Sequence, residues 1–335
     1  MKLVQGLWAA VIAMGLASST AYADETKLIF VSLVPADSRV AQTVFHPWVD
    51  RINAAGQGVV HLDGRDGFAL ANLDNVYNRV LDDVVQVGFA QQNAIGGKFI
   101  RSAVAGLPFV SDDSESASVA LWRLYRSGQI GDEYADIVPL FLTVFPQSGV
   151  HLVHPVAALD DFKGLKLIAV GKAQAEAVTA LGGAPLSIPL TDMYQGLQRG
   201  AADGAIASWT TFDPFRLGDV TRYHVESRLG TSTGMVFMTK KRFDGLSPAA
   251  QKVLMDNSGE AMSRSFGAYL DGDAKRVRDA VKATSDQSVT EPTAARSATW
   301  RDKVTPNDTA YVNSVPNGPA IFATYQQLLA AAKSR

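Results

Sequence analysis

The sequence predicts an α/β fold built from two β-sheet units, each flanked by helices. Two observations carry this prediction: short apolar strands alternate with helices over residues 27–90, and the same alternation recurs over residues 163–212. Strands that alternate with helices form parallel β-α-β units, and such sheets bind ligands in the crevice at the carboxyl ends of their strands. We therefore expect a site where these strands end.

The stretch from 163 to 212 predicts strand, helix, strand, helix and strand. KGLKLIAV is the first strand, and AQAEAVTALGG is a small-residue helix that stops at its glycine pair. PLSIP is the second strand, Thr191 is expected to cap the next helix, and Ala205–Ser208 form the third strand. We take this stretch as the organising unit of the chain.

The first third of the chain predicts a separate β-α-β-α-β unit. A strand over 27–33 precedes an amphipathic helix over 38–55, which carries apolar residues at steps of four. A strand over 59–62, a helix from Asn72 and a buried strand over 84–90 follow.

The remaining elements are predicted from shorter signals. Ser247 followed by proline is a strong helix start, and this helix is expected to run to Lys282 with an interruption at Asp271–Gly272. The other expected elements are a helix over 113–126, strands over 139–145, 150–153 and 232–239, and a last helix over 319–332.

The N-terminal residues predict a removable export signal. Lys2 precedes an apolar run over 6–16, and Ala21-Tyr22-Ala23 is a small-x-small cleavage site. The run is too short to span a bilayer core of about 30 Å, so residues 1–23 are read as a signal peptide and the mature chain as periplasmic, without membrane insertion.

Composition excludes several classes of protein. The chain has 335 residues, 47% of them hydrophobic, which suffices for about two domains. It has no cysteine, so it forms no disulfide, thiolate metal site or cysteine nucleophile. Charges of both signs are interspersed and the net charge is −2, which gives no footprint for nucleic acid.

Known catalytic and cofactor motifs are missing from the sequence. There is no G-x-S-x-G, no P-loop, no G-x-G-x-x-G and no H-E-x-x-H. His151 and His154 suggest a metal site, but their spacing in a strand puts them on opposite faces. Asp160–Asp161 read either as a catalytic pair or as a solvated loop. We expect no enzyme activity, cofactor or metal.

Some side chains follow the ends of predicted strands, where a ligand crevice is expected. Gln91 follows the strand over 84–90 and offers a donor and an acceptor. Trp209 and Phe212 follow the strand over 205–208, where aromatic faces can stack on a ligand or pack in the core. Both readings of these two aromatics stay open at this point.

The chain resembles the solute-binding proteins of tripartite ATP-independent periplasmic (TRAP) transporters over nearly its whole mature length. The resemblance rests on an ordered series of motifs. They are GLPF (106–109), EYAD (133–136), DFKGLKL (161–167), LGGAPLSIPLTDMYQGLQRGAADG (181–204) and LSPAAQKVLMDNSG (246–259).

The resemblance implies a two-lobed fold of the periplasmic binding protein type, joined by crossing strands and a long hinge-spanning helix. Lobe I is expected over 24–147 plus roughly 228–262, and lobe II over 148–227 plus roughly 263–335 with the C-terminal helices. Such proteins capture a small solute between the lobes and deliver it to a membrane permease. The alternative is a periplasmic sensor or scaffold of the same fold that presents to a membrane receptor.

The sequence departs from this family at the ligand-reading positions. The arginine that the family uses to clamp a ligand carboxylate falls at Ile168, and a second basic position falls near Ser148. Leu190 replaces a frequent aromatic residue. The expected ligand-binding residues are Leu33, Gln91, Ser148, Ile168, Leu190, Ser208, Trp209 and Phe212.

Loss of the clamp predicts a neutral, aromatic or otherwise atypical solute, because burying a carboxylate without its arginine costs several kcal/mol. The other possibility is that Arg65, Arg101 or Arg222 supplies the charge.

Simple dicarboxylates are therefore expected to give no thermal shift with the purified mature protein. Micromolar binding of such an acid, abolished by mutating one of the other arginines, would show that the positive charge had moved elsewhere.

Overall fold

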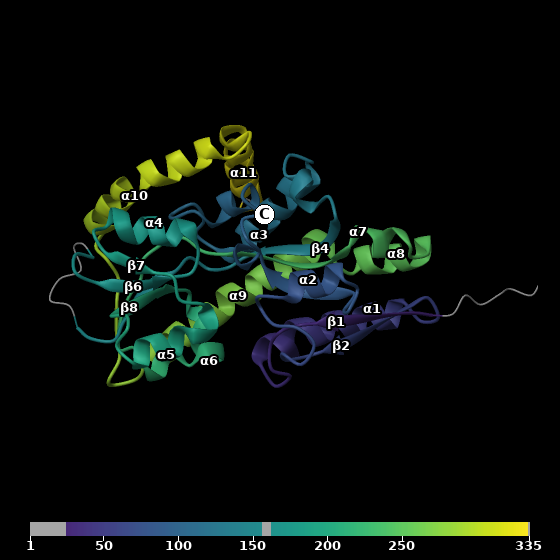
Figure 1. The fold of residues 1–335 in the computed structure, drawn as a ribbon, viewed down its shortest axis with the longest axis horizontal. Coiled ribbons are helices and arrows are strands. Elements are labelled where there is room, and N and C mark those ends of the chain that lie inside the picture. The colour runs from purple at the N-terminus through teal and green to yellow at the C-terminus, as the bar shows by residue number, and fades with distance from the viewer. Residues whose placement is uncertain (1–24, 156–161, 334–335) are drawn as a thin grey trace, which may run out of the picture.

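The computed structural model describes residues 25–155 and 162–333, which fold into two lobes joined by several crossing segments (Figure 1). The expected signal peptide over 1–23 and the Asp160–Asp161 pair lie outside the described residues. Each lobe holds one mixed β-sheet with helices on its faces, so the predicted fold class is confirmed. No helix within the two described ranges is both long and apolar enough to cross a membrane.

The sheet of the first lobe has five strands in the order β2-β1-β3-β10-β4. Strand β1 pairs in parallel with β2 and β3, and β10 pairs antiparallel with β3 and β4. The strands are β1 (Thr26–Val31), β2 (Val60–Arg65), β3 (Val87–Gln91), β4 (Ile137–Val144) and β10 (Thr233–Thr239). The helices around this sheet are α1 (His46–Ala55), α2 (Val76–Leu81), α3 (Ser114–Arg126), α7 (Lys240–Asp244), α8 (Pro248–Asp256) and α11 (Gly318–Lys333).

The sheet of the second lobe has six strands in the order β11-β9-β5-β8-β6-β7. Its strands are β5 (Gly149–Leu152), β6 (Lys166–Ala169), β7 (Ala184–Leu186), β8 (Gly204–Ala207), β9 (Tyr223–Val225) and β11 (Ser288–Thr290). The helices around it are α4 (Lys172–Ala180), α5 (Met193–Gln198), α6 (Phe212–Phe215) and α10 (Ala294–Ser314). Strands β6, β7 and β8 pair in parallel, as the β-α-β pattern predicts.

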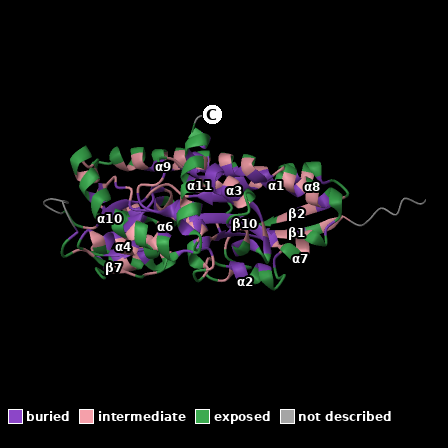
Figure 2. Ribbon diagram, turned by 90° about the horizontal axis from the view of Figure 1, so that it is seen from above, coloured by how far each residue is buried: buried purple, intermediate pink, exposed green. Residues whose placement is uncertain are grey.

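Buried residues gather along the strands of the sheets (Figure 2), and apolar side chains form separate cores in the two lobes. The first core is rich in aromatic rings. Trp48 is fully buried between Phe30 and Phe141, with edge-to-face ring contacts at 5.1 and 5.6 Å. Its indole nitrogen donates to the carbonyl oxygen of Asn257 at 3.0 Å. The steps of four in the 38–55 helix therefore mark its buried face; the segment Ala41–Phe45 is wound as a π-helix.

Helix α9 (Gly259–Lys282) runs through both lobes. Its N-terminal half supplies Phe266 and Leu270 to the core of the first lobe, and its C-terminal half supplies Ala274 and Val277 to that of the second. With 24 residues it is about 36 Å long, enough to pass from one lobe to the other. The hinge-spanning helix implied by the resemblance is present.

The crossing strands are tied to each other at the hinge. The backbone nitrogen of Ser148 donates to the oxygen of Gly230, and that of Leu229 donates to the oxygen of Ser148. Gly106 lies against this junction: a Cβ there would lie 2.4 Å from the backbone oxygen of Thr231. The GLPF motif therefore allows a close backbone approach at the hinge.

Three sequence-based expectations about helices are corrected. The chain breaks at Asn257–Ser258, between α8 and α9, while the predicted break at Asp271–Gly272 is continuous helix. The Asp271 carboxylate helps to keep the helix continuous at this point, because it accepts hydrogen bonds from the backbone nitrogens of Ser114 and Glu115 at the start of α3. Thr191 does not cap a helix but lies in a 3₁₀ turn before α5.

The C-terminal helices divide between the lobes. Helix α10, for which the sequence analysis gives no bounds, contributes Trp300 and Val304 to the core of the second lobe. Helix α11 packs on α3 and contributes Tyr325 and Leu329 to the core of the first lobe. The expected placement of the C-terminal helices with lobe II remains a prediction, and the packing of α11 on α3 speaks against it for α11.

Substituting Gly267 tests the close crossing of α9 over α3. A Cβ at Gly267 would lie 2.6 Å from backbone atoms of Ser114 and Glu115, so Gly267→Ala is expected to destabilise the fold by about 1–3 kcal/mol. Gly272 lies in the same helix with nothing within 4 Å, so Gly272→Ala is the matched control and is expected to stabilise by about 0.5–1 kcal/mol. Denaturant unfolding measures both; equal effects would contradict the close crossing.

Candidate functional site

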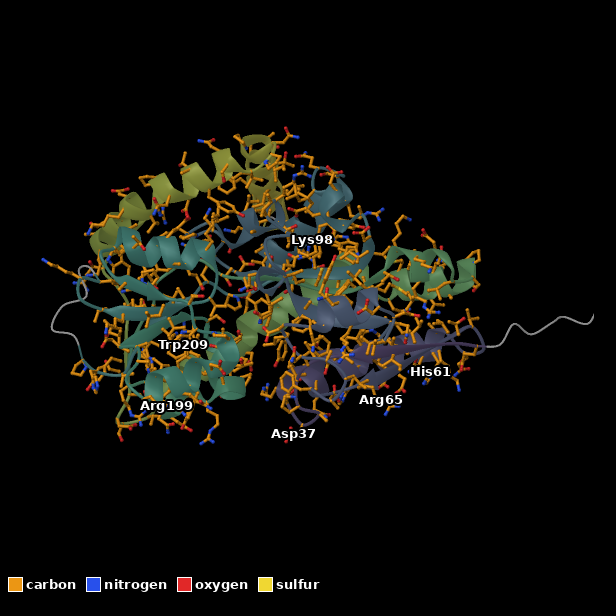
Figure 3. All side chains as sticks on the ribbon, viewed as in Figure 1. Asp37, His61, Arg65, Lys98, Arg199 and Trp209 are labelled. Carbon is orange, nitrogen blue, oxygen red and sulfur yellow. The ribbon has the colours of Figure 1, made fainter. Side chains whose placement is uncertain are left out.

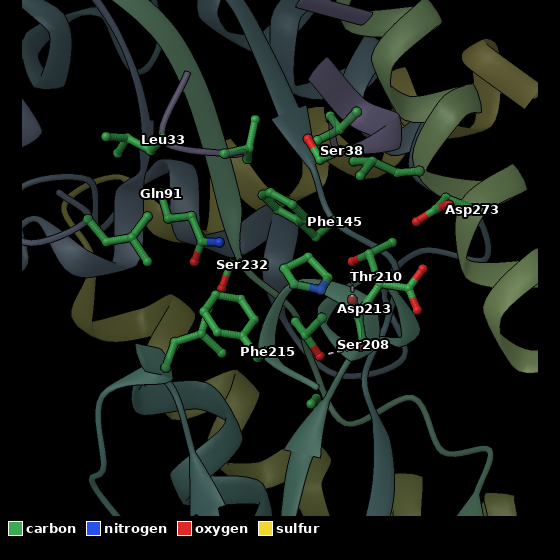
Figure 4. Close-up of a pocket in the computed structure, with 18 of the residues that line it drawn as sticks. Leu33, Ser38, Gln91, Phe145, Ser208, Thr210, Asp213, Phe215, Ser232 and Asp273 are labelled. Carbon is green, nitrogen blue, oxygen red and sulfur yellow. Dashed lines mark hydrogen bonds between the residues drawn. The ribbon is translucent and has the colours of Figure 1, made fainter. Parts of the chain in front are cut away.

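A cavity of about 660 Å³ lies between the two lobes. Side chains from both lobes and from α9 turn towards it (Figure 4). It is found at the carboxyl ends of several strands: Leu33 follows β1, Gln91 ends β3, Val170 follows β6 and Ser208 follows β8. This is the place that the alternating strand-helix pattern predicts for a ligand.

The first lobe and α9 give the cavity a continuous aromatic wall. We use this term for Phe45, Phe89, Phe145, Phe266 and Tyr269, which all line the cavity. Neighbouring rings within the wall lie with centroids 5.4 to 6.5 Å apart, in tilted or edge-to-face arrangements. These are the distances and angles that aromatic pairs prefer. Phe45 and Phe266 are only 1% exposed, so the partly exposed rings of Phe145 and Tyr269 form most of the wall's accessible surface.

The second lobe supplies the opposite wall. Val170, Leu190, Ile206 and Phe215 line it with aliphatic groups and one more ring. Leu190 comes from the 3₁₀ turn before α5, and Phe215 ends the short helix α6. The two walls together make a mostly apolar space that can bury a flat hydrophobic solute.

The uncharged polar groups in the cavity are amides and hydroxyls. The Gln174 side chain is tied in place, because its Nε2 donates to the Ser148 hydroxyl at 2.8 Å and its Oε1 accepts from the Val170 backbone. The Ser208 and Thr210 hydroxyls form a hydrogen bond at 2.6 Å. These groups can form hydrogen bonds in the cavity without adding charge to it.

Charged side chains that line the cavity form a network of ion pairs that includes residues of α9. Arg276 pairs with Asp213 of the second lobe and, at 2.8 Å, with Asp273. Arg39 of the first lobe reaches Asp273 at 3.6 Å. Arg216 pairs separately with Asp219 at 2.6 Å. The Arg39 and Arg216 side chains are 62% and 73% exposed, so their positive charges lie where water screens them.

Tyr269, a member of the aromatic wall, lies next to this network of ion pairs at Asp273. Burial, together with the nearby Asp273 carboxylate, raises the pKa of the Tyr269 hydroxyl to about 12. The phenol is therefore neutral at physiological pH, and its ring and hydroxyl remain available to the cavity.

Five of the eight sequence-predicted site residues line the cavity. They are Leu33, Gln91, Ser148, Leu190 and Ser208. Leu33 adopts a left-handed backbone with φ of 57°, at the turn that leaves β1. That these five contact a solute remains a prediction.

Ile168, Trp209 and Phe212 are not among the lining residues. Ile168 is fully buried under α5, where it shares an apolar cluster with Met193 and Leu197; Val170, beyond the end of β6, takes the exposed position on the cavity. The replaced clamp position therefore lies behind the second-lobe wall, not at its surface.

Trp209 and Phe212 pack in the core of the second lobe. Of the two interpretations left open by the sequence, core packing holds and ligand stacking does not. Their rings lie 4.8 and 4.7 Å from the imidazole of His151. The Trp209 indole nitrogen donates to the Glu226 carboxylate at 2.9 Å. They support the loop that follows β8, which carries Ser208 and Thr210 into the cavity.

His151 forms a buried histidine pair behind that loop. Its Nε2 donates to the Ala207 carbonyl at 3.0 Å, and its Nδ1 lies 3.1 Å from Nδ1 of His224, whose Nε2 donates to the Gln287 amide oxygen at 2.9 Å. Burial, aided by the neighbouring His224, lowers the pKa of His151 to about 3. Within the described ranges, no three histidine or carboxylate side chains come together as a metal site.

The three arginines proposed as a replacement clamp are engaged away from the cavity. Arg65 pairs with Asp63 on the first lobe (Figure 3), Arg101 pairs with Asp132, and Arg222 pairs with Asp286. None of the three lines the cavity.

The sequence reading missed the aromatic wall. Phe145 could have been predicted as a site residue, because it ends a predicted strand beside the expected crossing between the lobes. Phe45 and Phe266 lie on amphipathic helices, where an apolar residue reads only as core. The tertiary packing of α9 against β4 and against the Ala41–Phe45 segment places both rings beside the cavity.

The family model for bacterial extracellular solute-binding proteins, family 7, matches residues 30–313. Among curated proteins, the chain is 25% identical over 275 residues to the outer membrane transporter protein TsaT of Comamonas testosteroni. That alignment covers 80% of this chain and 79% of TsaT.

Solved structures share the whole fold. A TRAP solute-binding protein from Rhodoferax ferrireducens, in complex with copurified benzoate, superimposes with a TM-score of 0.85 at 23% identity, covering 92% of this chain and 99% of that one. A TRAP solute-binding protein from Bordetella bronchiseptica with bound mandelate gives a TM-score of 0.82 at 24% identity, covering 91% and 99%.

The buried His151 makes stability depend on pH. Because its pKa falls from 6.5 to about 3 on folding, the unfolded chain takes up a proton below pH 6.5 that the folded chain refuses. The free energy of unfolding should therefore fall by about 1.4 kcal/mol per pH unit below pH 6.5 on account of this group. Denaturant unfolding between pH 6.5 and 5 should show a shallower pH dependence for His151→Gln; an unchanged slope would argue against a neutral buried His151.

Proposed function

The chain belongs to family 7 of the bacterial extracellular solute-binding proteins, and on that basis we propose that it binds a small aromatic solute between its lobes for uptake by a TRAP transporter. Solute binding follows from the family. The aromatic character of the solute is our proposal. It rests on one observation above the others, the continuous aromatic wall of the cavity.

The chemistry of that wall favours a ring over a flexible polar solute. A ring that enters the cavity meets Phe89 and Phe145 on one side and Phe215 on the other. Aromatic pairs contribute about 0.5–1.5 kcal/mol beyond the area they bury. The two structural neighbours described above hold benzoate and mandelate, both of which carry one aromatic ring. Their ligands support the proposal by analogy of fold.

The size of the cavity sets a condition on binding. An apolar cavity of about 150 Å³ accommodates benzene, so about 660 Å³ is more than a single ring fills. Either the solute carries a substantial second part, or the lobes close further around it. The second lobe can move as a unit, because it has its own core and is joined to the first by a limited set of crossing segments.

The partner and the compartment follow from the family and the N-terminal sequence. Members of this family are binding proteins of the periplasm that work with membrane permease subunits. We propose that the chain is exported by the segment over 1–23 and hands its solute to such a permease, without catalysing a reaction on it.

Lobe closure and stabilisation on binding test the proposal. A panel of single-ring compounds, both neutral and acidic, should include members that raise the melting temperature. At 100 times its Kd, a ligand adds about 2.7 kcal/mol to the free energy of unfolding. Small-angle scattering should then show a smaller radius of gyration with the ligand bound. Binding with no change in radius, or stabilisation only by non-aromatic solutes, would count against the proposal.

Phe145→Ala tests the role of the aromatic wall. Removing this ring should weaken binding of an aromatic solute about tenfold, or about 1.4 kcal/mol, measured by calorimetric titration. Phe243→Ala is the matched control, because Phe243 is also half-buried in the first lobe but lies outside the cavity. Equal losses in the two variants would show that the wall does not contact the solute.

A further inference from the structure

Several uncharged polar side chains that line the cavity have no hydrogen-bonding partner among the described residues, namely Gln91, Thr191, Thr231, Ser232 and Tyr269. The Gln91 amide, at the end of β3, and the Ser232 hydroxyl, just before β10, both line the cavity. β3 and β10 are paired, with Gln91 opposite Gly234, so the two side chains come from adjacent strands (Figure 4). The hydroxyls of Ser148 and Ser208, by contrast, are already bonded to Gln174 and Thr210.

The charged groups that line the cavity attract an anion less strongly than an unpaired arginine would. Arg39, Arg216 and Arg276 are the cations that line the cavity in the described chain, and each faces an aspartate. The lining also holds three carboxylates, on Asp37, Asp213 and Asp273, so the formal charges cancel. Because each arginine already faces an aspartate, an incoming carboxylate would gain less from it than from an unpaired arginine. A carboxylate buried away from these arginines would lack a cation, which is strongly unfavourable.

We infer that the cavity selects aromatic solutes whose polar end is uncharged and carries both a donor and an acceptor, such as a carboxamide, and that Gln91 reads this end with help from Ser232. This inference rests on the proposed function. It also sets this chain apart from the two structural neighbours, because those proteins hold aromatic acids.

The hydrogen-bonding inventory explains the selection. The Gln91 amide has donors on Nε2 and an acceptor on Oε1, and a carboxamide can pair with both at once. A carboxylate only accepts, so it would bond to Nε2 and place a second oxygen against Oε1. A site built to hydrogen-bond a polar group discriminates strongly against an analogue that leaves one of its groups unpaired. Gln91 thus acts as a specificity-determining residue.

Benzamide and benzoate form a matched pair for the test, since they share shape and ring and differ in charge and in donors. Calorimetric titration of the mature protein should give at least tenfold tighter binding for benzamide. Gln91→Met keeps the side-chain length and removes both hydrogen-bonding groups, so it should weaken benzamide binding about tenfold and leave benzoate binding unchanged. Gln57→Met, on an exposed turn away from the cavity, is the control and should change neither.

Two outcomes would overturn the inference, and they are distinguishable. Tighter binding of benzoate than of benzamide, lost on Arg39→Gln, would show that the solute is an anion read at Arg39 and would leave the proposed aromatic function intact. Failure of every single-ring compound to bind would overturn the proposed function, and this inference with it. If Gln91→Met does not fold, Ser232→Ala replaces it, with a smaller expected loss of benzamide affinity.

Discussion

Helix α9 is the element on which the rest of the structure depends, because it belongs to both hydrophobic cores and to the cavity at once. Phe266 lies in the core of the first lobe and also faces the cavity, while Val277 is buried in the second lobe. Between them, Asp273 and Arg276 line the cavity and pair with groups of the two lobes. Any change in the angle between the lobes must therefore be accommodated along this helix or at the crossing strands.

The cavity offers two kinds of contact to a solute, apolar contact with the aromatic wall and hydrogen bonds with amides and hydroxyls. The aromatic wall provides area and shape, which favour a flat ring but discriminate little among rings. Direction comes from a few amides and hydroxyls, which stand where the strands end. Charge contributes least inside the cavity, since the arginines and aspartates that line it neutralise one another. If the proposed function holds, this cavity distinguishes solutes by their ring and their hydrogen-bonding pattern.

Much of the fold could be predicted from the sequence, because strands and helices leave periodic signals. The two β-α-β units and the position of Gln91 at a strand end followed from such signals. Helix α10 left a weak one, since only Trp300, Val304 and Val312 are buried along its 21 residues and Pro306 lies inside it. The sequence analysis placed the helix break at Asp271–Gly272 instead of Asn257–Ser258. The partner that stabilises Asp271 within the helix is α3, which is far away in the sequence.

The candidate site was less predictable than the fold, since a cavity is made by segments that meet only in the tertiary structure. Ile168 was placed correctly on a strand, but the sequence does not tell that α5 covers it while Val170 is left open. The contribution of α9 to the aromatic wall could not be read from a helix whose apolar face looks like ordinary core.

A crystal structure of the protein loaded with a bound aromatic compound tests the central claim most directly. The account predicts the ligand ring inside the cavity, with its centroid about 4.5–7 Å from the rings of Phe89 and Phe145. A ligand ring bound elsewhere, or a bound solute that leaves the aromatic wall exposed to water, would contradict it.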